Sequence, residues 1–143
     1  MLLRVRCILP ALWAGVLLCI AALAAPAAFG NLPVTDAGRV VAHIFVREAC
    51  LSLALSALLL VLERSHGAPG RVNGLLLWGA MGCTLLGYFA IQPLMPVARA
   101  GQGLLSFGQL HLISTAFYGL KTVLVLLLAW RVAGEELSRR PFS

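Results

Sequence analysis

Four long blocks of the chain are almost free of charge. Residues 7–35 and 72–98 contain no Asp, Glu, Lys or Arg, and residues 40–62 and 100–130 contain three such residues between them. Each block exceeds the roughly 20 residues that an α-helix needs to cross the hydrocarbon core of a bilayer. The pattern predicts four transmembrane helices, at about 8–28, 40–62, 73–94 and 105–130.

Four such spans use most of the 143 residues and leave only short loops and tails. The predicted fold is therefore all-α, an integral membrane four-helix bundle that forms a single transmembrane domain over residues 1–143. The composition agrees, with 61% hydrophobic and only 11% charged residues, where a soluble domain has about 25% charged residues. This composition excludes an ordinary water-soluble enzyme or binding module.

The arginines that flank the spans predict the orientation. Most of them flank the N-terminus, the connection between spans two and three, and the C-terminal tail: Arg4, Arg6, Arg64, Arg71, Arg131, Arg139 and Arg140. The other side has only Arg39 and Arg99. Because the cytoplasmic side retains Lys and Arg, both termini are expected in the cytoplasm. These arginines account for most of the net charge of +6. Because they are divided among several segments that flank the spans, they indicate contacts with the lipid bilayer rather than with nucleic acid.

The first block leaves one alternative open. Residues 1–6 with the following apolar run and the small residues at 22–28 also fit a secretory signal with its cleavage site. The apolar run is longer than a typical signal core, so retention of the span is expected. Cleavage would leave three spans and place the termini on opposite sides of the membrane.

Polar residues inside the spans gather mainly on spans two and four. Span two carries Arg47 and Glu48, and span three contributes Gln92. Span four carries a stripe at a spacing of three to four residues, formed by His111, Ser114 or Thr115, Tyr118, and Lys121 or Thr122. An ionised residue inside a span costs on the order of 2.5 to 3.5 kcal/mol, so each needs a partner or a function.

Depth along the helices predicts a partner for Glu48. This residue lies about 12 Å below one membrane boundary when counted from Val40, and Lys121 lies about 13.5 Å above the other when counted from Trp130. In a hydrocarbon core of about 30 Å these depths nearly coincide. We therefore expect Glu48 to pair with Lys121 or with Tyr118. The pair is either a structural link or part of a polar face between spans two and four that binds or passes a small solute or ion.

A haem or copper site is the main alternative. His43, His111 and Met95 are predicted within about one turn of the same membrane boundary, and imidazole and thioether groups are ligands of both centres. Ordinary interfacial hydrogen bonds explain the histidines equally, and neither HxxxH nor CxxCH occurs. Catalytic and nucleotide-binding motifs are also absent from the sequence. The prediction is a protein without enzymatic activity that needs no cofactor.

Small residues and tryptophans suggest how the spans are held. Gly79, Cys83 and Gly87 form a stripe in span three that favours close helix packing within the bundle. The alternative for this stripe is a homo-oligomer or docking to a larger membrane complex, of which the chain would be an accessory subunit. Trp13 and Trp130 are expected to be interfacial anchors near the ends of their spans.

Several short motifs carry a family resemblance. They are Ala25, Pro26 and Phe29, the segment AGRVVAHIFVREACLSL (37–53), the run LGYFAIQPLM (86–95) and FGQLHLIST (107–115). Together they resemble the domain of unknown function 4149 and are similar to transmembrane protein 205, in a short proteobacterial form. The resemblance implies a four-helix protein of the bacterial inner (plasma) membrane with no established reaction. It draws attention to Pro26, Phe29, Glu48, Gln92, Pro93, Phe107, His111 and Ser114. A looser likeness to small copper-resistance D membrane proteins belongs to the haem or copper alternative.

Overall fold

The computed structural model describes residues 2–65 and 70–139, so Arg140 lies outside the described residues. The first rod consists of α1 (Leu2–Cys19), the π-helical segment η1 (Ile20–Ala24) and α2 (Ala25–Asn31), and the long helix α3 (Val34–Ser65) returns beside it. The third rod consists of α4 (Arg71–Thr84), the π-helical segment η2 (Leu85–Ala90), the 3₁₀ turn η3 (Gln92–Leu94) and α5 (Met95–Arg99). The fourth rod is the helix α6 (Phe107–Arg139), which returns beside the third. The all-α prediction is confirmed. Four rods are long and apolar enough to cross a membrane: Arg4–Asn31, Val34–Ser65, Arg71–Arg99 and Phe107–Glu135.

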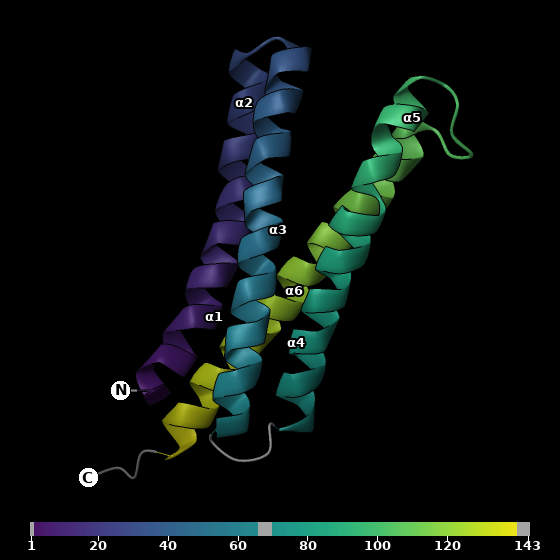
Figure 1. Ribbon diagram of the computed structural model, residues 1–143. Coiled ribbons are helices and arrows are strands. Elements are labelled where there is room, and N and C mark those ends of the chain that lie inside the picture. The colour runs from purple at the N-terminus through teal and green to yellow at the C-terminus, as the bar shows by residue number, and fades with distance from the viewer. Residues whose placement is uncertain (1, 66–69, 140–143) are drawn as a thin grey trace.

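The rods form two antiparallel hairpins whose chain ends lie at one end of the bundle (Figure 1). We call this the terminal end, and the opposite end, with the α2–α3 turn and α5, the loop end. In the terminal half α1 packs on α3 and α6, and α4 packs on the same two helices, which closes a ring of four. Toward the loop end the two hairpins diverge in Figure 1. The bundle is therefore closed in one half and open in the other.

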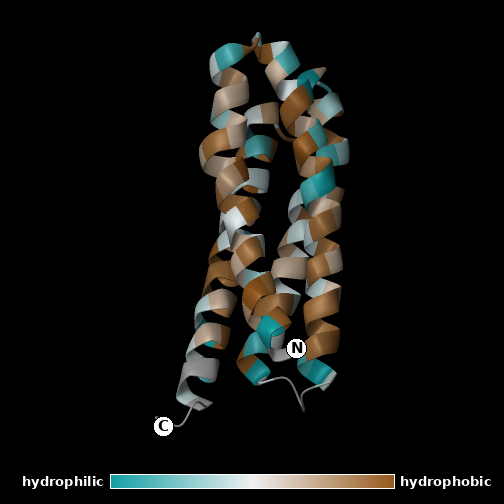
Figure 2. Cartoon of the chain, turned by 90° about the vertical axis from the view of Figure 1, so that its left-hand side faces the viewer, coloured by the Kyte–Doolittle hydropathy of each residue, from teal (hydrophilic) through white to brown (hydrophobic). Residues whose placement is uncertain are grey.

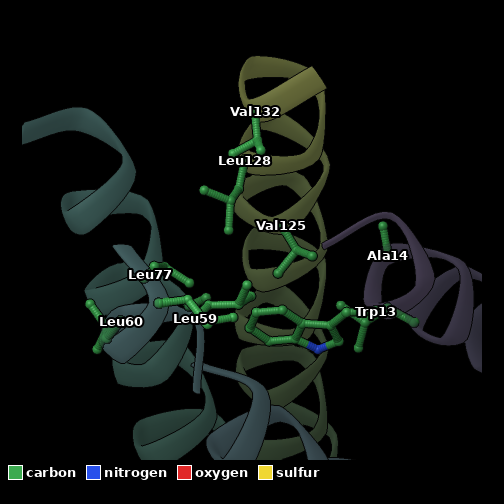
Figure 3. Packing of buried hydrophobic residues seen from close by; sticks show 11 residues of the cluster. Trp13, Ala14, Leu59, Leu60, Leu77, Val125, Leu128 and Val132 are labelled. Carbon is green, nitrogen blue, oxygen red and sulfur yellow. The ribbon is translucent and has the colours of Figure 1, made fainter. Parts of the chain in front are cut away.

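The closed half is filled by an apolar core (Figure 3). Trp13, Leu59, Leu77 and Leu128 are each at most 2% exposed. The Trp13 indole also donates a 2.9 Å hydrogen bond from Nε1 to Ser52 Oγ. The prediction that Trp13 is an interfacial anchor is therefore wrong, because its ring fills the bundle interior and its N–H finds a partner there. Trp130, in contrast, is 82% exposed.

The outer surface is as apolar as the core. Large apolar side chains such as Leu23, Leu75 and Leu112 are well exposed, and brown, hydrophobic positions run along the outside of the rods in Figure 2. In water such a surface would favour aggregation. In a bilayer it matches the lipid tails, which leaves side-chain packing and polar contacts to hold the helices together.

A polar cluster closes the terminal end, and we call it the terminal cluster. The Arg6 guanidinium binds the Glu63 carboxylate, and its Nη2 atom donates a 2.9 Å hydrogen bond to Glu135 Oε2. Asn73 donates to Glu135 Oε1 at 3.1 Å and accepts from Arg131 Nε at 3.2 Å. The cluster links α1, α3, α4 and α6. From the sequence, Arg6 is only one of the flanking arginines that predict the orientation, whereas in the structure its side chain is also buried and paired.

Prolines accompany both π-helical segments. Pro26 lies at the start of α2 directly after η1, and Pro93 lies in η3 shortly after η2. Proline cannot donate a backbone hydrogen bond to the preceding turn, and a π-helical turn is a known way to accommodate such an interruption. Pro96 lies at the start of α5, so helical structure continues as far as Arg99. Both hairpins therefore carry irregular backbone on the side of the open half.

The small-residue stripe of span three lies against α6. A Cβ atom built on Gly87 would be 2.6 Å from Phe117 Cβ, and one on Gly79 would be 3.0 Å from Leu124 Cδ1. The prediction of close packing within the bundle is confirmed at these two glycines. At these two glycines α6 covers the face, and docking to a larger complex or formation of a homo-oligomer stays a prediction.

We expect Gly87→Ala to lower the free energy of unfolding by about 1–3 kcal/mol, because the new methyl group overlaps Phe117 and the two helices must separate. Gly82→Ala is the matched control, since a Cβ there meets nothing within 4 Å. Denaturation of both variants in detergent, followed by circular dichroism, measures the difference. Equal stability of the two variants would contradict this packing.

Candidate functional site: a blind intramembrane cavity

A cavity of about 550 Å³ lies between the two hairpins in the open half. Its walls come from η1, α2 and α3 of the first hairpin and from α4, η2, η3, α5 and α6 of the second. Because the hairpins are joined below it in the closed half, the divergence seen in Figure 1 is what creates this space. The cavity is therefore a direct product of the fold.

An ion pair forms the floor of the cavity. Lys121 Nζ lies 2.7 Å from Glu48 Oε1 and 2.9 Å from Oε2. The two side chains are only 4% and 3% exposed, respectively. This is the first of the two pairings expected from depth along the helices. Buried charges need this kind of mutual compensation, because an unpaired carboxylate or ammonium group in hydrocarbon is very costly.

Further hydrogen bonds hold the floor in place. Ser52 donates to Glu48 Oε1 and accepts from the Trp13 indole, so a polar chain runs from α1 through α3 to α6. Tyr118 does not pair with Glu48: its hydroxyl donates to the Leu17 carbonyl oxygen at 2.8 Å. The pairing of Glu48 with Tyr118 is therefore wrong. Tyr118 instead lies under the Lys121 ammonium group, whose nitrogen is 4.9 Å from the ring centroid.

The floor separates the cavity from the packed core. Glu48, Tyr118 and Lys121 line the cavity, whereas Trp13, Leu17 and the other core residues of the closed half do not. Leu17 and Val125 are 0% exposed. The cavity is thus blind toward the terminal end.

Polar groups in the cavity wall are largely bound to backbone. Ser114 donates to the Gly87 carbonyl oxygen at 2.9 Å, across the two helices of the second hairpin, and Thr84 donates to the Ala80 carbonyl oxygen. Gln92 and His111 also line the cavity. The His111 ring stacks on Phe107 with a centroid distance of 5.9 Å. The wall is therefore mainly apolar and aromatic, with a few polar positions.

The structure separates the remaining predicted residues. Arg47 and His43 are exposed on α3, and neither lines the cavity. Met95 and His111 do line it, so the three candidate metal ligands are not gathered around this cavity. Among residues 2–65 and 70–139, no group of three or more His, Cys, Asp or Glu side chains could hold a metal ion.

Sequence reasoning missed several residues of the cavity wall, among them Phe45, Thr84, Arg99 and the wall position of Cys83. Phe45 meets Tyr118 edge to face, with ring centroids 5.2 Å apart. Arg99 was counted only as a flanking charge, although its place at the end of α5 beside the prolines offered a signal. The others are ordinary small or apolar residues, for which the sequence alone contains no distinguishing signal.

Comparison with known proteins identifies the family. The family model described as "Domain of unknown function (DUF4149)" matches residues 8–102, which is more than half of the chain. The chain belongs to this family. Neither a curated protein nor a solved structure matches it. The matched region includes Glu48 and Gln92 but ends before α6, which supplies Lys121.

We expect Glu48→Gln and Lys121→Met each to lower the free energy of unfolding by about 3–5 kcal/mol, because each leaves a buried charge without its partner. The double variant should lose clearly less than the sum of the two single losses, since no unpaired charge remains. Denaturation of the four proteins in one detergent measures this coupling. Additive losses would show that the two side chains are not energetically paired.

Proposed function

We propose that this member of the DUF4149 family is a non-enzymatic protein of the bacterial inner membrane that binds a small, largely apolar solute between its two hairpins. The observation that carries the proposal is the cavity of about 550 Å³, walled by both hairpins and floored by a closed ion pair. Its volume falls within the range of about 300–1,000 Å³ that is typical of small-molecule sites. Its mainly apolar wall with a few polar positions is also typical of such sites.

Binding is favoured over passage through the chain. A solute that crossed the membrane inside one copy would have to traverse the closed half, where Trp13, Leu17 and Val125 are at most 1% exposed. Packed interiors of this kind contain few voids as large as a water molecule. The Glu48–Lys121 pair lies above this core and is itself buried. Passage would therefore require a large rearrangement or an assembly of several copies.

Binding is also favoured over catalysis. The carboxylate and ammonium groups of the floor neutralise each other, and the Ser114 and Thr84 hydroxyl groups donate to backbone carbonyl oxygens. A hydroxyl nucleophile would instead need a nearby general base. The groups at this floor are thus better suited to hold a ligand than to transform it.

The proposed topology places both termini in the cytoplasm and keeps the first span. The terminal end, where both chain ends lie (Figure 1), carries most of the flanking arginines, in agreement with the positive-inside rule. Loss of α1 would remove Trp13 and Leu17 from the core and Arg6 from the terminal cluster. Retention of the span is therefore favoured over cleavage.

Cys83 provides a native reporter of the cavity, because it lines the space and is 7% exposed. In a variant with the other three cysteines replaced by alanine, in phosphatidylcholine nanodiscs, we expect N-ethylmaleimide to modify Cys83 slowly. Saturating dodecanol should reduce this rate severalfold, because the occupied cavity excludes the reagent. Mass spectrometry of the intact protein measures the rate.

Two glycines give a matched pair of controls. A Cβ on either Gly38 or Gly108 meets nothing within 4 Å, but only Gly38 lines the cavity. Gly38→Phe should fill the space, slow the modification of Cys83 and abolish the effect of dodecanol, whereas Gly108→Phe should behave as the parent. A rate that depends neither on dodecanol nor on Gly38→Phe would contradict the proposed function.

A further inference from the structure

The charges on the cavity wall do not balance. Three ionised side chains line it, Glu48, Lys121 and Arg99, and the first two compensate each other at the floor. The Arg99 guanidinium carbon lies 4.5 Å from the centroid of the Phe107 ring. Within the part of the chain that the structure describes, no carboxylate forms an ion pair with Arg99. The lining therefore carries one uncompensated positive charge.

This charge lies at the opposite end of the cavity from the floor. Arg99 is the last residue of the third candidate span, which places it at the level of the membrane surface. It contacts Phe107, and Lys121 follows Phe107 by 14 residues on the same helix, which corresponds to about 21 Å. The cavity is therefore elongated, with a cation at its mouth and a neutral pair at its floor.

The surface between these two ends is suited to a hydrocarbon chain. Phe29, Phe45, Tyr88 and Met95 contribute to it, and these side chains offer apolar area rather than charge. An elongated apolar channel with one cation at the membrane surface complements a chain-like molecule that has one anionic head group. An arginine guanidinium group is also well matched to a carboxylate, which it binds through two parallel hydrogen bonds.

We infer that the cavity binds a single-chain amphiphile with one negative charge, of the fatty-acid type, whose carboxylate contacts Arg99 and whose chain extends toward the Glu48–Lys121 pair. This inference rests on the proposed function and adds to it the chemical class of the solute. A cationic amphiphile would place like charges together at the mouth, and an uncharged one would leave Arg99 without a partner.

Substitution of Arg99 tests the inference in the Cys83 assay. Dodecanoate, dodecanol and dodecyltrimethylammonium share one chain and differ in charge. Arg99→Gln should raise the dodecanoate concentration for half-maximal protection about tenfold, which is the effect of losing one charge-assisted contact. It should leave dodecanol within about twofold of the parent and should not weaken dodecyltrimethylammonium. Each probe is compared between variants, so differences in membrane partition cancel.

Arg39→Gln is the matched control, because Arg39 lies near the loop end, is 75% exposed and does not line the cavity. It should leave protection by dodecanoate unchanged. Unchanged dodecanoate protection in Arg99→Gln, with dodecanol still protecting, would overturn the inference and leave the proposed function in place. Failure of every probe to protect Cys83 would overturn both. Protection by phosphatidylglycerol nanodiscs alone would assign the cavity to a two-chain membrane lipid and would also overturn the inference.

Discussion

The mutual neutralisation of Glu48 and Lys121 is the constraint on which the rest of the structure depends. Two ionised groups in the middle of a membrane are tolerated only when they are paired and hydrogen-bonded, and here Ser52 and the Trp13 indole extend the pair across to α1. These hydrogen-bonded side chains hold three helices together at one level. On one side of it the helices pack into an apolar core, and on the other they diverge.

The terminal cluster explains why the divergence is confined to one half. Lipid tails are as apolar as the helix surfaces, so helices in a membrane need close packing or polar contacts to stay together. Arg6, Glu63, Asn73 and Glu135 supply such contacts from all four helices at the terminal end. With the bundle held there and at the ion pair, the loop half can remain open. Pro26, Pro93 and the two π-helical segments lie on that side.

The sequence predicts well how deep a residue lies along its helix, and it predicts poorly which face of that helix points into the bundle. Gaps between charged residues located the four spans, and counting residues from the span ends brought Glu48 to the level of Lys121, because helix rise is nearly constant. Which face of a helix points inward is a different matter. Arg47 and Glu48 are neighbours, yet one is exposed and the other is buried. Trp13 was misread for a related reason: in a membrane, apolar residues occupy both the outer surface and the core, so periodicity does not mark the buried face.

The cavity could not be predicted because it depends on how two hairpins diverge, which no local pattern encodes. Once it is known, its two ends have separable roles. The floor combines polarity with zero net charge, so it ends the cavity without attracting an ion of either sign. The mouth carries the only uncompensated charge among the described lining residues, at the level where lipid head groups lie. Selection of a charged ligand is therefore expected to occur at the membrane surface through Arg99, whereas the floor determines how deep the ligand reaches and keeps the bundle intact.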